Sequence, residues 1–327
     1  RDPLWSRGLG DVYKRQNEPL APLLVSSYAV SPAHATWDPD LEAELLPALC
    51  ALPDVVGLEV PWIGGLHPHD PGWFLRHVPA AAELAVTPLP WVMKRCAADA
   101  RYGIASPDED GRRAAIADLR AVARDVRRID HDTDASVTVV ALHTAPQGGG
   151  DRARLAASLA EISGWDWAGA RLVIEHCDAA VPGHPWEKGF LTLDDELSAM
   201  LSVDAPLALW LNWGRSVIET RDADAVTGQL AEAAATGRLA GLTFSGSAAI
   251  DGPYGPAWTD GHLPLAAADP ASGSLLDAAH VAAALASAGQ VERLGLKVSR
   301  RPGDTTAEDV IRTVDDNLRA LRDAARA

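Results

Sequence analysis

Short apolar runs alternate with amphipathic helical stretches from residue 23 to the end of this chain. Eight runs have the length and apolar character of strands, and they span residues 23–30, 55–62, 83–90, 136–144, 171–178, 206–214, 239–247 and 292–299. Continuous apolar strands separated by helices are typical of a parallel sheet covered by helices. Eight such units in about 300 residues predict α/β architecture as a single (β/α)8 TIM barrel.

The stretches between the strands have the periodicity of amphipathic helices. The clearest ones span residues 40–52, 110–129, 151–162, 222–235 and 306–327. Several begin with Asp, Ser or Thr, which cap helix N-termini well, and their apolar residues recur at three-to-four spacing. No glycine-rich dinucleotide loop follows the first strand, where the sequence reads SSYAVSP, so an open doubly wound sheet is disfavoured.

The first sixteen residues look foreign to the fold. The segment SRGLGDVYKRQ resembles the read-through translation of a transposon-based sequencing adapter, whose codons would give Gly-Asp-Val-Tyr-Lys-Arg-Gln. We therefore expect residues 1–16 to be a non-native, disordered segment and residues 17–327 to form the barrel domain.

Composition excludes several classes of function. A formal net charge of −16 argues against a nucleic-acid partner, which requires a basic surface. No apolar run approaches the roughly 18–20 residues that a membrane span needs. The three widely spaced cysteines, Cys50, Cys96 and Cys177, indicate neither a disulfide framework nor a zinc motif, so we expect a cytoplasmic protein.

Charged and polar side chains gather at the predicted C-terminal ends of the strands, where TIM barrels place their chemistry. Glu59, Glu175 and Lys297 each interrupt an otherwise apolar strand, and we predict that they are catalytic. The residues that we predict to bind substrate lie at strand ends or in the following loops, and they are Trp62, His143, His176, Asn212, Trp213, Arg215, Asp260 and His262. Polar groups at this density are costly to desolvate unless they bind a ligand.

Other interpretations of these residues stay open from the sequence alone. Side chains alternate along a strand, so Glu175 and His176 cannot both face the barrel axis, and His176 could pack between strand and helix. Glu59 and Lys297 could form a structural ion pair with each other. Asn212 and Arg215 could serve as loop caps, and the segment TDGH that contains Asp260 and His262 could be a turn.

Three features resemble the xylose-isomerase-like TIM-barrel superfamily, which includes sugar phosphate isomerases and epimerases. They are the fifth-strand pattern LVIEH, the glutamate within the second strand, and the final strand GLKVS with its long following helix. In metal-dependent members a divalent cation is held by Glu, Asp, His and Glu from strands 5 to 8. The corresponding residues here are Glu175, Asn212, Ser245 and Lys297, so the resemblance implies an uncharacterised branch with a degenerate metal site.

The leading hypothesis is a carbohydrate-active isomerase or epimerase that transfers a proton next to a sugar carbonyl. Glu175 or Glu59 would be the base, with a pKa raised by a dry barrel mouth, and Lys297 or Arg215 would stabilise the oxyanion. We expect no cofactor, although a divalent metal held by Glu175 with His143 stays open. The expected partner is a small carbohydrate, with an anionic substituent and a homo-oligomeric state left open.

Two alternatives belong to other classes of function. A glycoside hydrolase or lyase would use Glu59 and Glu175 as a carboxylate pair, and the eleven tryptophans would suit glycan binding. A barrel without a metal could also survive as a non-catalytic sugar-binding protein.

Overall fold

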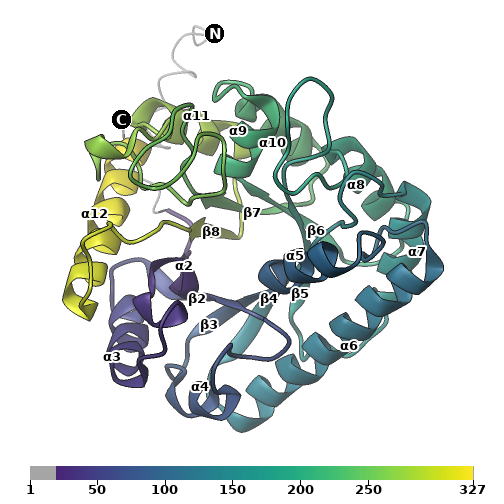
Figure 1. Ribbon diagram of the computed structural model, residues 1–327, viewed down its shortest axis with the longest axis horizontal. Helices are drawn as coiled ribbons and strands as arrows, with labels where there is room; N and C mark the ends of the chain where they lie inside the picture. Colours follow the sequence, from purple (N-terminus) through teal and green to yellow (C-terminus); the bar gives the residue numbers. More distant parts are fainter. Residues whose placement is uncertain (1–19, 327) are drawn as a thin grey trace, which may run out of the picture.

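Eight parallel strands form a closed barrel in the computed structural model, which describes residues 20–326 (Figure 1). The strands are β1 (Leu23–Ser26), β2 (Val55–Pro61), β3 (Glu83–Thr87), β4 (Ser136–Leu142), β5 (Arg171–His176), β6 (Ala208–Asn212), β7 (Leu239–Phe244) and β8 (Arg293–Leu296). Each strand pairs with its neighbours in chain order, and β8 closes the ring on β1. The predicted single (β/α)8 barrel is therefore confirmed, whereas the segment 1–16 lies outside the described residues.

Helices surround the barrel on its outside (Figure 1). They are α3 (Pro39–Cys50), α4 (Pro71–His77), α5 (Leu89–Ala98), α6 (Glu109–Asp132), α7 (Arg152–Ser163), α8 (Leu193–Leu201), α9 (Trp213–Thr220), α10 (Val226–Ala235), α11 (Ala278–Ala288) and α12 (Ala307–Arg326), with the short turns α2 (Ser27–Val30), η1 (Pro32–His34) and η2 (Pro270–Ser272). Many of these helices have a capping side chain at the N-terminus. Asp38, Asp108 and Asp151, for example, each accept a hydrogen bond from a backbone N–H of the first turn. Within residues 20–326 no helix is long and apolar enough to cross a membrane.

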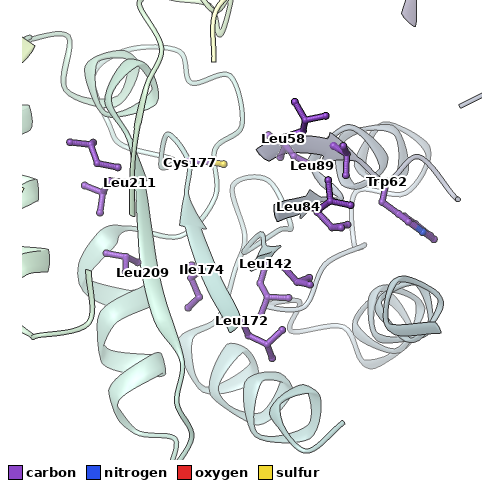
Figure 2. Close-up of a cluster of buried hydrophobic side chains, with 14 of the residues drawn as sticks. Leu58, Trp62, Leu84, Leu89, Leu142, Leu172, Ile174, Cys177, Leu209 and Leu211 are labelled. Carbon is purple, nitrogen blue, oxygen red and sulfur yellow. The ribbon is translucent and has the colours of Figure 1, made fainter. Parts of the chain in front are cut away.

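Strand alternation divides the apolar side chains into two layers. Leu209 and Leu211 on β6, like Ile174 on β5, belong to the large cluster between barrel and helices, part of which is drawn in Figure 2. The inner layer is smaller, and its members are Leu24, Ala85, Val139, Ala141, Val173, Ala208, Trp210 and Ala240. Because half of these inner residues are alanines, the barrel axis is less filled than the bulky branched layers that usually pack a TIM barrel.

The observed strands are shorter at their C-terminal ends than the apolar runs predicted. The first run continues beyond Ser26 into α2, and β8 ends at Leu296, one residue before Lys297. The sixth run already turns into α9 at Trp213. Lys297 therefore lies just beyond the sheet, whereas Glu59 and Glu175 lie within β2 and β5.

Candidate active site at the barrel mouth

A central cavity occupies the C-terminal half of the barrel. It is partly open to solvent and is lined by residues from many strands. Glu59, Glu175 and Lys297 all line it, although they come from β2, β5 and the end of β8. Trp210 forms part of the wall because Gly241 opposite it has no side chain; an added Cβ there would lie 2.3 Å from the indole. The three predicted catalytic residues thus share one cavity.

Lys297 and Glu59 form an ion pair on the β8–β1–β2 side of this cavity. The Lys297 Nζ lies 2.8 Å from Glu59 Oε1 and 4.9 Å from the centre of the Tyr28 ring. Burial alone would lower the pKa of Lys297, but Glu59 and Tyr28 outweigh it and raise that pKa above its ordinary value. Lys297 is the only hydrogen-bond partner of the Glu59 carboxylate among the described residues, and one oxygen of that carboxylate remains available.

Glu175 lies at the centre of a second set of contacts on the β4–β6 side. His143 Nε2 is 2.8 Å from Glu175 Oε2, and Arg215 Nη1 donates to Glu175 Oε1 at 2.6 Å. Burial would raise the pKa of Glu175, but Arg215, Lys297 and His143 together lower it well below its usual range. Glu175 is therefore a fixed anion, and the expectation that a dry mouth would raise its pKa is wrong.

The loops after β5 and β7 extend this set of contacts outward. Asp260 accepts a hydrogen bond from Arg215 Nε at 3.0 Å and lies 3.3 Å from Lys188 Nζ and 3.2 Å from His262 Nδ1. His262 Nδ1 also lies 3.2 Å from the hydroxyl of Ser245 at the end of β7. Burial would raise the pKa of Asp260, but Arg215 and Lys188 hold it well below the ordinary value. Arg215 is thus clamped between two carboxylates.

Several buried polar atoms at the barrel mouth have no hydrogen-bond partner among the described residues. They are the hydroxyls of Ser26 and Ser247, His143 Nδ1, Asn212 Nδ2 and Arg215 Nη2. Buried polar groups in native proteins are nearly always satisfied, so a group of unpaired ones indicates water or a ligand. Donors and acceptors are both present in this set, as the hydroxyls of a sugar require.

Three predicted substrate-binding residues point away from this cavity. His176 is fully buried on the outer face of β5, where it bonds Glu196 of α8 and Glu219 of α9. Trp213 packs edge-on against His280 of α11, with ring centres 5.7 Å apart. Trp62 donates its Nε1 hydrogen to Asp125 of α6 at 2.8 Å.

The alternation rule explains the placement of His176, because an inward Glu175 directs the next side chain of β5 to the outer layer. Among the predicted binding residues, His143, Arg215, Asp260 and His262 belong to the connected set, and Asn212 caps α9 by accepting a hydrogen bond from the backbone N–H of Arg215. Their participation in binding stays a prediction.

The sequence interpretation missed two residues of the mouth. Lys188, which was not among the predicted site residues, is buried and contacts Asp260 and Glu187. Tyr28 stacks on the Lys297 ammonium from the turn after β1. The scarcity of lysine, four residues against 25 arginines, was the available signal for Lys188, because a lysine that persists in such a composition often occupies a site that arginine cannot fill.

The residues at the superfamily's metal positions do not fit a divalent cation. Both oxygens of Glu175 are bonded to His143 and Arg215, so the Arg215 guanidinium lies beside the carboxylate, and a metal held by Glu175 with His143 stays a prediction. Asn212 and Ser245 carry no charge, and the Lys297 ammonium stands where a fourth ligand would supply a carboxylate. Hard divalent ions need several anionic oxygen ligands, so this set repels rather than holds one.

A separate group of potential metal ligands lies outside the barrel. His34, Glu42 and His67 offer ligand atoms within 4.8 Å of one another. The Nδ1 atom of His67 accepts hydrogen bonds from the backbone N–H groups of His69 and Asp70 at 3.3 and 3.1 Å. Since a neutral imidazole with an accepting Nδ1 carries its proton on Nε2, the latter donates to Glu42 at 3.2 Å and is not free for a metal.

Comparison with solved structures defines the class of barrel. The chain is similar to an L-ribulose 3-epimerase, with a TM-score of 0.58 and 16% identity over 94% of this chain and 96% of the other. It is also similar to a putative xylose isomerase of Rhodospirillum rubrum, with a TM-score of 0.59 and 12% identity over 93% and 99%. These likenesses show the xylose-isomerase-like barrel fold.

Sequence comparison places the chain more narrowly. A model of the family described as "Domain of unknown function (DUF4862)" matches residues 24–313, and the chain belongs to this family. An uncharacterized protein of Salmonella typhimurium, STM3670, is 31% identical over 310 residues, which cover 93% of this chain and 97% of the relative.

Proposed function

We propose that this protein is a sugar isomerase or epimerase that moves a proton at the carbon next to a carbonyl. The observation that carries the proposal is the central cavity, which is lined by the partly exposed carboxylate of Glu59 and by the buried Lys297 cation. Proton abstraction next to a carbonyl requires a base and a charge that stabilises the enolate oxygen. The similarity to an L-ribulose 3-epimerase supports the same class of reaction.

Glu59 is the better base of the two predicted ones. Arg215 and His143 occupy both oxygens of Glu175, and its lowered pKa makes it a weak proton acceptor. Glu59 keeps one oxygen without a partner among the described residues, facing the cavity that it lines. In the proposed reaction, Glu59 takes the carbon-bound proton and Lys297 stabilises the negative oxygen that forms. In an isomerase, Glu59 then returns the proton to the adjacent carbon; an epimerase would also need a proton donor on the opposite face of the enolate.

The remaining charged groups would position the substrate. Arg215 is held by Glu175 and Asp260, and its Nη2 atom has no partner among residues 20–326. Asn212 Nδ2 and the hydroxyls of Ser26 and Ser247 are further groups for substrate hydroxyls. A glycoside hydrolase is less well supported, because its second carboxylate must attack the sugar or activate a water, whereas both oxygens of Glu175 are bonded to His143 and Arg215.

Exchange of carbon-bound hydrogen with solvent tests this proposal without knowledge of the product. Aldoses and ketoses are incubated with the protein in D2O, and deuterium at the carbon next to the carbonyl is followed by NMR. Glu59→Gln should slow the exchange by about 10²–10⁴-fold, the usual contribution of a positioned base.

Glu83→Gln is the matched control, since Glu83 is also a strand carboxylate paired with a cation, Arg293, but lies where β3 and β8 begin. It should leave the exchange rate unchanged. Exchange that survives in Glu59→Gln would overturn the assignment of the base. Sugar binding without any exchange would identify a binding protein instead.

A further inference from the structure

The central cavity, as the structure shows it, is too small to hold a sugar. Its free volume is about 30 Å³, which is enough for one or two water molecules, whereas a monosaccharide is several times larger. The charged side chains of Glu175, Arg215 and Lys297 at the mouth are all buried. A sugar can therefore reach them only if part of the barrel mouth moves.

Two long loops at the mouth are each closed at the base by backbone hydrogen bonds. In the loop after β5, the Ala180 N–H donates to Phe190 O at 3.1 Å. In the loop after β7, Gly246 and Leu263 exchange two hydrogen bonds, at 2.8 and 3.1 Å. The segments between these closures are named here the β5 flap (residues 180–189) and the β7 flap (residues 247–262).

The flaps are packed far less firmly than their bases. Phe190 and Leu263 at the bases are buried, but of the flap residues, all of which the structure describes, only Ala248 has a buried hydrophobic side chain. Trp186 in the β5 flap is 40% exposed, and Ile250 in the β7 flap is 69% exposed. Segments with few buried apolar contacts open locally at a low cost in free energy. Each flap can therefore open on a base that stays in place.

Polar contacts join the two flaps to each other and to the site. The Asp260 backbone N–H in the β7 flap donates to the Glu187 carboxylate in the β5 flap. The Asp260 carboxylate lies 3.3 Å from Lys188 Nζ in the β5 flap and accepts a hydrogen bond from Arg215, which also bonds Glu175. Opening of the β7 flap therefore separates Asp260 from Arg215, and closure restores that contact.

Arg221, which follows α9, contacts both flaps. Its Nη2 donates to the backbone oxygen of Pro185 in the β5 flap at 2.6 Å, and its guanidinium lies 4.8 Å from the centre of the Trp258 ring in the β7 flap. Trp258 and His262 have φ angles of +58° and +51°, in the left-handed region that favours glycine. Such strained conformations persist only where the surrounding contacts hold them. The contact with Arg221 thus stabilises the closed form of the β7 flap.

We propose that the β5 and β7 flaps form a two-part lid over the central cavity, held closed by Arg221 and Glu187, and that this lid opens to admit the substrate. The structure then represents the closed state, in which Asp260 and Glu175 hold the Arg215 guanidinium between them. That the molecule admitted is a sugar rests on the proposed function, whereas the opening of the lid is a property of the chain alone.

Hydrogen exchange of backbone amides, followed by mass spectrometry on the protein without any ligand, tests the lid. The amides of Lys188 and Asp260 are bonded to the carboxylates of Asp178 and Glu187, so they exchange only when the flaps open. Peptides that contain them should exchange on the order of 10²-fold faster than peptides of β5 and β6, at a rate that low urea concentrations leave unchanged. Flap amides that exchange as slowly as the strands, with the same dependence on urea, would overturn the proposal.

Arg221→Ala and Arg120→Ala form a matched pair of variants. Arg120 stacks on Trp165 at the same distance of 4.8 Å, but it belongs to α6 and contacts neither flap. Arg221→Ala should speed the exchange of Lys188 and Asp260 by about tenfold or more, because it removes a cation–π contact and a hydrogen bond from a charged donor. Arg120→Ala should leave it unchanged. Flap exchange at the wild-type rate in a folded Arg221→Ala variant would contradict the role of Arg221.

Amide exchange involves no sugar, so the lid and the proposed reaction are tested separately. Flaps that open in a protein without any sugar exchange would support the lid and count against the proposed function. Deuterium exchange into a sugar by a protein whose flaps stay as protected as its strands would overturn the lid and leave the proposed function standing.

Discussion

Lys297 places a buried positive charge at the barrel mouth. Its ammonium is 1% exposed, yet it is held charged by the Glu59 carboxylate and covered by the Tyr28 ring. A charge this deep is stable only when it is paired, because desolvation of an ion costs several kcal/mol. The same pairing leaves the cation facing the cavity, so a structural ion pair and a catalytic electrostatic role are compatible in this protein.

Replacement of Lys297 by methionine should destabilise the fold as well as the site. The Lys297→Met variant leaves Glu59 without a partner, and loss of one member of a buried pair typically costs about 3–5 kcal/mol. Urea unfolding followed by circular dichroism measures the change. The double variant Glu59→Gln with Lys297→Met should recover part of the loss, since it removes the unpaired charge. A double variant as unstable as the sum of the two single changes would show that the pair is not coupled.

The alternation of side chains along a strand accounts for which residues could be placed from the sequence. It showed that Glu175 and His176 cannot both face the barrel axis, and that His176 could pack between strand and helix. In the structure Glu175 contacts Arg215 and His176 contacts Glu196 of α8, which agrees with this alternative. Trp62 and Trp213 lie beyond the last residues of β2 and β6, where the rule no longer applies. The lowered pKa of Glu175 could not be predicted, because Arg215 reaches it from the helix after the next strand, 40 residues away.

At the level of elements, a buried network ties β5 to the helices α8 and α9. His176 Nδ1 lies 2.7 Å from Glu196, and its Nε2 lies 3.1 Å from Glu219. Glu219 also accepts hydrogen bonds from the backbone N–H of Ala179 and from Gln229 of α10. Because α9 carries Arg215 at its other end, this network holds the helix that brings the guanidinium to Glu175 and Asp260.

The network should make the protein sensitive to alkaline pH. Burial would lower the pKa of His176, but Glu196 and Glu219 outweigh it and raise it to about 10. Because the pKa of His176 is higher in the folded than in the unfolded state, its protonation stabilises the fold fully at a pH below the unfolded-state pKa of 6.5. This stabilisation is lost as the pH rises through about 10. Unfolding free energies measured from pH 7 to 10 should fall by an amount on the order of 4 kcal/mol.

Two histidine variants test whether His176 is the group that causes this pH dependence. His176→Gln should be less stable at pH 7 and show a flatter profile up to pH 10. His131→Gln changes an exposed histidine paired with Asp132, and it should leave the profile almost unchanged. A wild-type slope that persists in His176→Gln would place the titrating group elsewhere.

A second network links α3 to the loop after β2 and should govern stability in acid. Burial would raise the pKa of Glu42, but hydrogen bonds from His34 and His67 lower it to about 2. The stabilisation from a lowered pKa is present above about 4.5 and is lost as the pH falls toward 2. It amounts to roughly 3 kcal/mol, so acid unfolding of Glu42→Gln should depend less on pH than that of the wild type.

The exposed Glu44 on the same helix supplies the control for this experiment. Glu44→Gln should reproduce the wild-type acid profile. If Glu42→Gln also follows the wild-type profile from pH 5 to pH 2, the hydrogen bonds to His34 and His67 contribute nothing measurable.

At the scale of the whole molecule, the barrel was predictable and the arrangement of its mouth was only partly so. Eight alternating strand and helix units fixed the fold class, and the rule that chemistry lies at the C-terminal strand ends brought Glu59, Glu175 and Lys297 to one cavity. Lys188 escaped prediction because it lies in the long loop between β5 and α8, whose path depends on tertiary contacts such as the one with Asp260. Loop geometry of this kind leaves no periodic signal in a sequence.

The central claim is that Lys297, rather than a divalent metal, supplies the positive charge for proton transfer at this mouth. The most direct test measures solvent deuterium exchange into a sugar substrate after exhaustive chelation with EDTA, for the wild type and for a folded Lys297→Met variant. The account predicts that the chelated wild type keeps its full exchange rate and that Lys297→Met loses it. Exchange that disappears on chelation and returns with added Mn²⁺ or Mg²⁺ would contradict the claim.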